Sequence, residues 1–343
     1  MSEDPAAAAR AAGLRYADVS SPGIERRRVG RGWSYRDPSG ATIRDAGTLR
    51  RIKELVIPPA WSEVWINPHP RGHIQATGLD ARGRKQYRYH EKWRATRDET
   101  KFAGLVDFAH VLPVVRKRVD ADLALRGLPR DKTVATIVRL LDESLIRIGN
   151  IAYARENKSF GLTTLQNDQA EVSGSSVHFA FRGKSGVFHE VDVRDRRVAR
   201  IVRRLQDLPG QHLFQYLDEA GEPHAIDSDD VNAYLGEASG AEITAKDFRT
   251  WAGTVLAARS LRHEGPFDSE AACKAAIVAA VDAVAERLGN TRAVCRASYI
   301  HPAILDGCSA GTLCQFLPSR RKLAGLDEDE QWTLDYLTAA HAG

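Results

Sequence analysis

The sequence has few cysteines and no long apolar run. None of the cysteines belongs to a C-x-x-C pair, so we expect free thiols that are buried or partly exposed. They are Cys273, Cys295, Cys308 and Cys314. No apolar run approaches the length of a membrane span, which excludes a membrane partner. Residues 1–12 are rich in Ala but carry Glu3 and Asp4 where a secretory signal needs positive charge, so we expect a cytoplasmic protein.

A phosphate-binding glycine loop is also missing. Gly183-Lys184-Ser185 imitates the end of such a loop, but position 178 is His, where the motif requires Gly. The tripeptide also lies between two expected strands, so we exclude a bound nucleotide. Internal repeats and low-complexity linkers are absent too, and 343 residues are enough for two domains with a sizeable core.

Charge is unevenly distributed along the chain, although the net charge is only +4. Residues 82–97 hold seven Lys or Arg and one acid, and residues 194–204 hold six Arg and one Asp. Tyr87, Tyr89 and Trp93 interleave with the first run, which favours a nucleic-acid surface over a merely solvated one. The second run fits a phosphate-contacting face and a solvated face equally well. We therefore expect a nucleic-acid partner.

Residues 1–90 are predicted to form a small β-rich domain. Residues 37–40, Asp-Pro-Ser-Gly, have the composition of a turn between strands over 32–36 and 41–43. Pro58-Pro59 should end a short helix over 45–56. Further strands are expected over 64–66, 73–78 and 86–89.

Residues 91–343 are predicted to form a mainly helical domain with a small β-hairpin sheet. Apolar residues at 134, 137, 138, 141 and 145 follow the spacing of an amphipathic helix. Further helices are expected from Thr244 through Arg249 and over 268–288, and a turn over 182–186 should join strands 177–181 and 187–193. The predicted fold class is therefore α+β.

A single tyrosine, Tyr299, lies in the segment RAVCRASYIHP, which is predicted to be a short helix stopped by Pro302. Only about one tyrosine hydroxyl in a thousand is ionised at neutral pH. Such a hydroxyl becomes a useful nucleophile when cations stabilise the phenolate and the charge that builds on its target.

Arg147, Lys184 and Arg249 can supply those cations. Two arginines can hold the two non-bridging oxygens of a phosphodiester through bidentate hydrogen bonds. A lysine at a hairpin tip can protonate the leaving 5′ oxygen when neighbouring cations lower its pKa. Attack by Tyr299 would then store the bond energy in a phosphotyrosine link, without ATP, a metal or another cofactor.

The order Arg147, Lys184, Lys246-Asp-Phe-Arg249-Thr, Asn290, Tyr299 resembles that of the small type IB DNA topoisomerases of poxviruses and bacteria. The segments GRKQYRYH (83–90), ENKSFGLTTL (156–165) and SYIHP (298–302) add to the resemblance, which covers about residues 15–320. It implies a β-rich N-terminal domain over 1–90 that clamps DNA. It also implies a catalytic domain of the DNA breaking-rejoining type over 91–343.

The resemblance also implies a role for each of these residues. Tyr299 is the nucleophile that takes the DNA 3′ phosphate, and Arg147 and Arg249 stabilise the transition state. Lys184, assisted by Arg147, protonates the 5′ leaving oxygen. Lys246 contacts the region of the scissile phosphate.

Further positions are implied to contact DNA or the phosphate. Residues Gln86, Tyr87, Arg88 and Tyr89 match a segment with which the viral enzymes touch DNA. Asn290 replaces a histidine of the viral members and of tyrosine recombinases, as in bacterial members of the family. Its amide can donate a hydrogen bond to a non-bridging oxygen but cannot share a charge.

The expected function is relaxation of supercoiled duplex DNA by transient cleavage of one strand, by a monomer associated with the nucleoid. One alternative is a site-specific tyrosine recombinase. Recombinases usually have His-x-x-Arg where this chain has Lys246-x-x-Arg249, and their N-terminal domain is typically helical. The other alternative is a DNA-binding protein without catalysis.

Three polar residues receive structural interpretations. His301, which precedes Pro302, is expected to cap a helix or to pack locally rather than to act as an acid or base. Asp142 and Glu143 are expected to pair with Arg139 or Arg147.

Overall fold

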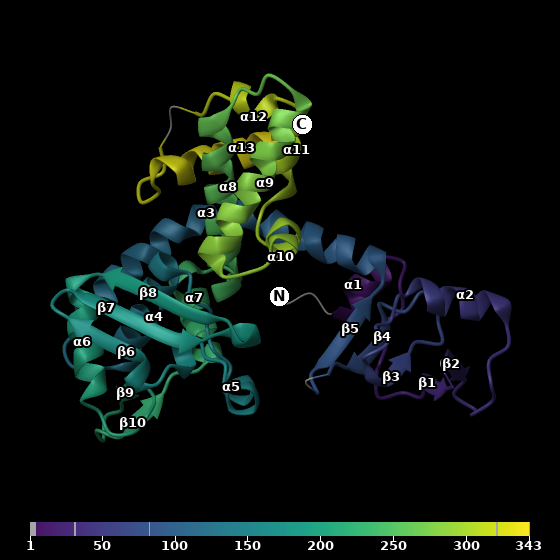
Figure 1. Ribbon diagram of the computed structural model, residues 1–343. Helices are drawn as coiled ribbons and strands as arrows, with labels where there is room; N and C mark the ends of the chain where they lie inside the picture. The colour runs from purple at the N-terminus through teal and green to yellow at the C-terminus, as the bar shows by residue number, and fades with distance from the viewer. Residues whose placement is uncertain (1–4, 31, 82, 320–321, 343) are drawn as a thin grey trace. The chain divides into compact units, whose positions relative to one another are not determined.

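The chain folds as two compact units, Met1–Lys101 and Phe102–Gly343, and each is described by itself. The computed structural model describes residues 5–30, 32–81, 83–319 and 322–342. Strands gather in the first unit and helices dominate the second, which confirms the predicted α+β class (Figure 1). The division falls inside α3 (Glu91–Leu123).

The first unit is built on a five-stranded antiparallel sheet with the order β2-β1-β3-β4-β5. The strands are β1 (Ile24–Val29), β2 (Gly32–Arg36), β3 (Ser62–Ile66), β4 (Ile74–Leu79) and β5 (Lys85–Tyr89), and the helices are α1 (Pro5–Ala11) and α2 (Ala46–Glu54). Its apolar core contains Ile24, Ile52, Val64, Ile66 and Ala76. The three later strands and α2 confirm the predictions for this region.

The predicted hairpin over 32–43 is only half formed. Asp37 Oδ1 accepts hydrogen bonds from the backbone of Ser39 (2.9 Å) and Ala41 (3.0 Å), so the turn is present. The second arm, however, forms only an isolated bridge between Thr42 and Arg36. The strand that pairs with β2 is instead the preceding β1, whose sequence Ile-Glu-Arg-Arg-Arg-Val carries too few apolar residues to be predicted.

The second unit is mainly helical. Besides the rest of α3, it contains α4 (Arg130–Ser144), α5 (Ile151–Asn157), α6 (Arg196–Gln206), α7 (Ser228–Ser239), α8 (Ala245–Glu264), α9 (Glu270–Leu288), α10 (Arg292–Ser298), α11 (Pro302–Ser309), α12 (Thr312–Gln315) and α13 (Glu328–Ala342), and the short 3₁₀ turns η1 (Leu162–Thr164) and η2 (Asn167–Gln169). The amphipathic helix predicted around 134–145 is α4, and that predicted over 268–288 is α9. Among the described residues, no helix is both long and apolar enough to cross a membrane.

A three-stranded sheet of the second unit has the order β6-β7-β8. Its strands are β6 (Ala170–Ser173), β7 (Ser176–Arg182) and β8 (Phe188–Arg194), and a separate pair consists of β9 (Gln215–Leu217) and β10 (Pro223–Ala225). The predicted hairpin is β7–β8, joined by the 3₁₀ turn η3 (Lys184–Gly186). Alternate residues of β7, including Phe179 and Phe181, are buried, and α4 and α6 contact this sheet (Figure 1).

The tyrosine segment differs from its prediction at one end. The helix α10 ends at Ser298, and Tyr299 follows as its C-terminal cap residue. Pro302 does not stop this helix but begins α11, because proline lacks the N–H that the first helical turn leaves unpaired. His301 caps α11 by accepting a hydrogen bond from the backbone of Ala303 (3.1 Å), as expected.

The predicted ion pairs are partly right. Glu143 pairs with Arg139 (3.7 Å), as expected. Asp142 pairs instead with Arg116 (2.8 Å) of α3, a long-range contact that helical spacing cannot indicate. The cysteines are free thiols, as expected, with Cys273 Sγ and Cys308 Sγ 3.2 Å apart.

Candidate active site

Arg147 lies just beyond α4, where the chain leaves the helix. Leu145 ends α4 in the left-handed conformation (φ 59°), which turns the chain away from the helix axis. The backbone carbonyl of Arg147 then accepts a hydrogen bond from the N–H of Leu162 (2.8 Å). The segment 156–165 therefore fixes the backbone from which the Arg147 side chain extends.

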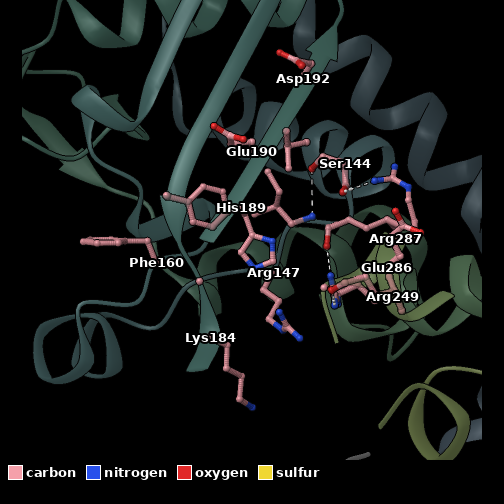
Figure 2. Close-up of a pocket in the computed structure, with 17 residues that line it drawn as sticks. Ser144, Arg147, Phe160, Lys184, His189, Glu190, Asp192, Arg249, Glu286 and Arg287 are labelled. Carbon is pink, nitrogen blue, oxygen red and sulfur yellow. Dashed lines mark hydrogen bonds between the residues drawn. The ribbon is translucent and has the colours of Figure 1, made fainter. Parts of the chain in front are cut away.

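The buried side chain of Arg249 comes from α8. The predicted start of this helix is confirmed, because Asp247 accepts a hydrogen bond from the backbone N–H of Thr244 (2.7 Å). The guanidinium of Arg249 donates to the carbonyl of Leu145 and to that of Leu288 (2.8 Å). The same arginine thus joins the C-terminal ends of α4 and α9 (Figure 2).

Asn290 follows the last turn of α9 and contacts Arg147. The helix ends at Gly289 in the left-handed conformation (φ 59°), which favours glycine. The Oδ1 atom of Asn290 accepts a hydrogen bond from Nη2 of Arg147. Within the described part of the chain, Nδ2 of Asn290 and Nε of Arg249 are buried and have no hydrogen-bond partner.

Tyr299 is half-buried next to Arg249. The Arg249 guanidinium lies 5.3 Å from the centre of the tyrosine ring. The same helix, α8, also packs closely against the Tyr299 backbone, because a Cβ atom at Gly253 would lie 2.5 Å from the Tyr299 carbonyl oxygen. Thr254 Oγ1 also donates to that carbonyl oxygen (3.4 Å) and accepts from the backbone of His301 (3.1 Å).

Positive charge is concentrated where these side chains meet. Burial, followed by the like charge of Arg147, lowers the pKa of Arg249 to about 10, while Tyr299 acts in the opposite direction. Arg249 therefore remains charged at neutral pH. Two neighbouring guanidinium groups and an unpaired amide donor form a site that suits an anion with several oxygen atoms.

Lys184 lines the same cavity as Arg147 and Arg249. It is exposed at the hairpin tip, as predicted, and Figure 2 shows its side chain extending away from both arginines. Lys246 is exposed in the first turn of α8, three residues before Arg249. The structure therefore pairs Arg147 with Asn290 and Arg249 with Tyr299, and the two arginines line one cavity with Lys184.

The predicted DNA-contact residues of β5 divide between two faces of the strand. Tyr87 and Tyr89 stack on each other with ring centres 5.9 Å apart. Gln86 donates to Asp80 (2.9 Å), and Arg88 donates to the carbonyl of Val56 (3.1 Å). Because successive side chains alternate across a strand, the two tyrosines form one surface and the other pair serves internal contacts.

Sequence reasoning missed His189 in the cavity. Its ring stacks on Phe181 with ring centres 5.4 Å apart. Burial, followed by Arg147 and Arg249, lowers the pKa of His189. The alternation of side chains along β8 could have indicated that His189 faces inward, since it places His189 on the same face as Val191 and the buried Val193.

Two family models match most of the chain. A model described as eukaryotic DNA topoisomerase I, catalytic core, matches residues 90–309. A model described as bacterial DNA topoisomerase IB, N-terminal domain, matches residues 32–80.

Curated relatives include viral enzymes. DNA topoisomerase 1B of Acanthamoeba polyphaga mimivirus is 32% identical over 260 residues, which are 74% of this chain and 77% of that protein. DNA topoisomerase I of Monkeypox virus and DNA topoisomerase 1B of Vaccinia virus (strain Western Reserve) are each 27% identical over 145 residues. That match spans 41% of this chain and 46% of each poxvirus protein.

Proposed function

Because the chain belongs to the type IB DNA topoisomerase family, we propose that it relaxes supercoiled duplex DNA through a transient phosphotyrosine link to a single strand. The observation that carries this proposal is the cluster of Arg147, Arg249, Asn290 and Tyr299. Its arginines hold a concentrated positive charge next to the tyrosine, and two of its buried N–H donors have no hydrogen-bond partner among the described residues.

The cleavage step uses the hydroxyl of Tyr299 as the nucleophile. The Oη atom attacks the phosphorus of a DNA phosphodiester, so a new bond forms between tyrosine oxygen and phosphorus while the bond to the 5′ oxygen breaks. The phenolic proton of Tyr299 passes to solvent water, and the departing 5′ oxygen receives a proton from Lys184. The DNA 3′ phosphate is then linked to the enzyme, and the 5′ hydroxyl end is free to rotate.

Arg147, Arg249 and Asn290 stabilise the five-coordinate transition state. The two guanidinium groups bind the non-bridging oxygens, on which charge increases as the tyrosine attacks. The unpaired Nδ2 of Asn290 donates a further hydrogen bond, while its Oδ1 orients Arg147. Attack by the 5′ hydroxyl on the phosphotyrosine reverses the step and releases Tyr299.

The first unit contributes a DNA-binding surface in this proposal. The stacked pair Tyr87 and Tyr89 lies on the edge strand β5, within the basic run that the sequence indicates. We assign the clamp role to residues 1–90 and the chemistry to residues 91–343. The match of residues 32–80 to a topoisomerase N-terminal domain favours this assignment over the recombinase alternative.

Denaturing gel analysis of wild type and Tyr299→Phe with an end-labelled duplex tests the chemistry. A protein–DNA adduct that survives detergent and carries the label of the 3′-phosphate side is expected with wild type alone. An adduct with Tyr299→Phe, or an adduct to the 5′ side, would contradict the proposal.

A further inference from the structure

The ring of His189 touches two segments that carry proposed catalytic residues. A Cβ atom at Gly183 would lie 2.6 Å from Cδ2 of His189, and one at Gly289 would lie 2.5 Å from Cε1. Such distances are too short for real contacts, so both glycines leave the space that the ring occupies. Gly183 immediately precedes Lys184, and Gly289 immediately precedes Asn290.

Position 183 requires glycine because of the packing of the His189 ring and not because of its backbone conformation. Its φ of −92° is accessible to any residue. The ring is held from a third side by stacking on Phe181, which is also the cross-strand partner of His189. His189 is thus fixed between the hairpin and the end of α9, and Figure 2 shows its ring in the cavity beside Arg147.

We propose that His189 is a positioning residue for strand cleavage: its ring acts as a spacer that holds the hairpin tip with Lys184 against the end of α9 that presents Asn290. This inference rests on the proposed function of Lys184. Without the ring, the hairpin would lose its contact with Gly289, and the lysine would no longer be held at one distance from the leaving oxygen. A misplacement of about 1 Å can cost roughly a hundredfold in rate.

Burial and the two neighbouring arginines favour a neutral His189 ring. The charged groups that line the same cavity are Lys184, Glu190 and Asp192 of the hairpin, Arg147 beyond α4, Arg249 of α8, and Glu286 and Arg287 of α9. Burial, followed by Arg147 and Arg249, lowers the pKa of His189, so the ring is uncharged at neutral pH. It can therefore pack beside two guanidinium groups without adding a further positive charge to the site.

Two DNA substrates that differ only in the 5′ leaving atom test the proposal. His189→Ala and Lys184→Ala are compared with wild type in single-turnover cleavage of a duplex with a 5′ oxygen or a 5′ sulfur leaving group. A thiolate needs no proton, so His189→Ala should be about tenfold or more slower on the oxygen substrate and close to wild type on the sulfur substrate. An equal loss on both substrates, or no loss on either, would overturn the proposal.

The matched control is His224→Ala. His224 also stacks on an aromatic ring of a hairpin, Tyr216, with ring centres 5.3 Å apart, and it lies outside the cavity. The His224→Ala variant should cleave both substrates at the wild-type rate. If Lys184→Ala itself shows no gain with sulfur, the general-acid role in the proposed function fails, independently of His189.

A double-mutant cycle tests the spacer without any assumption about Lys184. Gly183→Ala alone should slow cleavage of the oxygen substrate, because its methyl group displaces the ring. In the His189→Ala background the same methyl group has room, so the double variant should be no slower than His189→Ala. Additive losses would overturn the proposal. If His189→Ala folds poorly, the single Gly183→Ala variant, which keeps the histidine, still tests the spacer, and wild-type cleavage by that variant would overturn the proposal.

Discussion

At the scale of single residues, Arg249 connects the fold to the chemistry. It is only 5% exposed, and its guanidinium is held by the carbonyls of Leu145 and Leu288. A buried donor without a partner costs roughly 1–3 kcal/mol, so the unpaired Nε indicates a site that an anion completes. The same contacts position the guanidinium before DNA binds.

Replacing Arg249 should therefore impair catalysis strongly. Arg249→Ala should slow single-turnover cleavage by about a hundredfold or more, since removing one transition-state donor costs about that much. Arg249→Lys should restore little, because one ammonium cannot reach both carbonyls and the phosphate. Thermal melting of each variant separates a loss of stability from a loss of rate, and a near wild-type rate for Arg249→Ala would exclude its proposed role.

Asn290 allows a test of the unpaired amide donor. Asn290→Asp keeps an oxygen that can accept from Arg147 but replaces the Nδ2 donor with a negatively charged acceptor. Because that charge repels the phosphate, Asn290→Asp should cleave more slowly than Asn290→Ala in single-turnover assays. The reverse order, or wild-type cleavage by Asn290→Asp, would show that the donor is not used.

The sequence indicated the candidate catalytic side chains but not their contacts. Tyr299 and the cations could be found because their order resembles a known family. The hydrogen bond between Arg147 and Asn290 joins residues 143 positions apart, and such pairing depends on how helices pack. His189 was missed because a single histidine in a strand belongs to no sequence motif. The sequence does not show that its ring packs against Gly183 and Gly289.

At the scale of secondary-structure elements, strong periodicity was the reliable signal. The helix α4 and the hairpin β7–β8 were predicted because apolar residues repeat at the spacing of their structures. The strand β1 was missed because three consecutive arginines interrupt its pattern, and it is a strand only through pairing with β2 and β3. The interpretation of Pro302 as a stop was wrong because proline also suits the first turn of a helix.

Arg116 joins three helices of the second unit. It lies in α3 and donates to Asp142 of α4 (2.8 Å) and to Glu330 of α13 (2.8 Å). Burial alone would raise the pKa of Glu330, but the hydrogen bonds and charge of Arg116 outweigh burial and lower it. Glu330 also accepts a hydrogen bond from Trp251 (3.2 Å) of α8, so the carboxylate is central to this packing.

Glu330→Gln should therefore destabilise the protein in a pH-dependent way. Breaking a buried ion pair costs roughly 3 kcal/mol in the free energy of unfolding at neutral pH. A carboxyl with a lowered pKa contributes stability above its unfolded value of 4.5 and loses it as the pH falls through the folded value. Urea unfolding should show the two proteins converging below about pH 4.5, and a pH-independent difference would refute this account.

At the scale of the whole molecule, phosphate contacts should dominate DNA affinity. Each lysine or arginine that binds a phosphate releases counterions, so affinity falls steeply as salt concentration rises. We expect the exposed Lys246 to contribute most clearly outside the proposed catalytic cluster, because it lies three residues before Arg249 at the start of α8. The basic run over 82–97 should contribute in the same way.

Lys246→Ala should weaken binding equally for different DNA sequences. It should also reduce the slope of log affinity against log salt concentration by about one. Lys274→Ala is the matched control, since Lys274 is an exposed lysine whose charge is already paired with Glu270 of the same helix. Fluorescence anisotropy over a salt series measures both slopes. An unchanged slope for Lys246→Ala would remove this residue from the DNA interface.

Relaxation of supercoiled plasmid in EDTA without ATP is the decisive assay for the proposed tyrosine chemistry, with wild type and Tyr299→Phe assayed side by side. Tyr299→Phe removes one hydroxyl from a half-buried ring and should leave the fold intact, which a melting curve verifies. Wild type should relax positive and negative supercoils, and Tyr299→Phe should relax neither. Relaxation by the folded Tyr299→Phe protein, or none by a DNA-binding wild type, would contradict it.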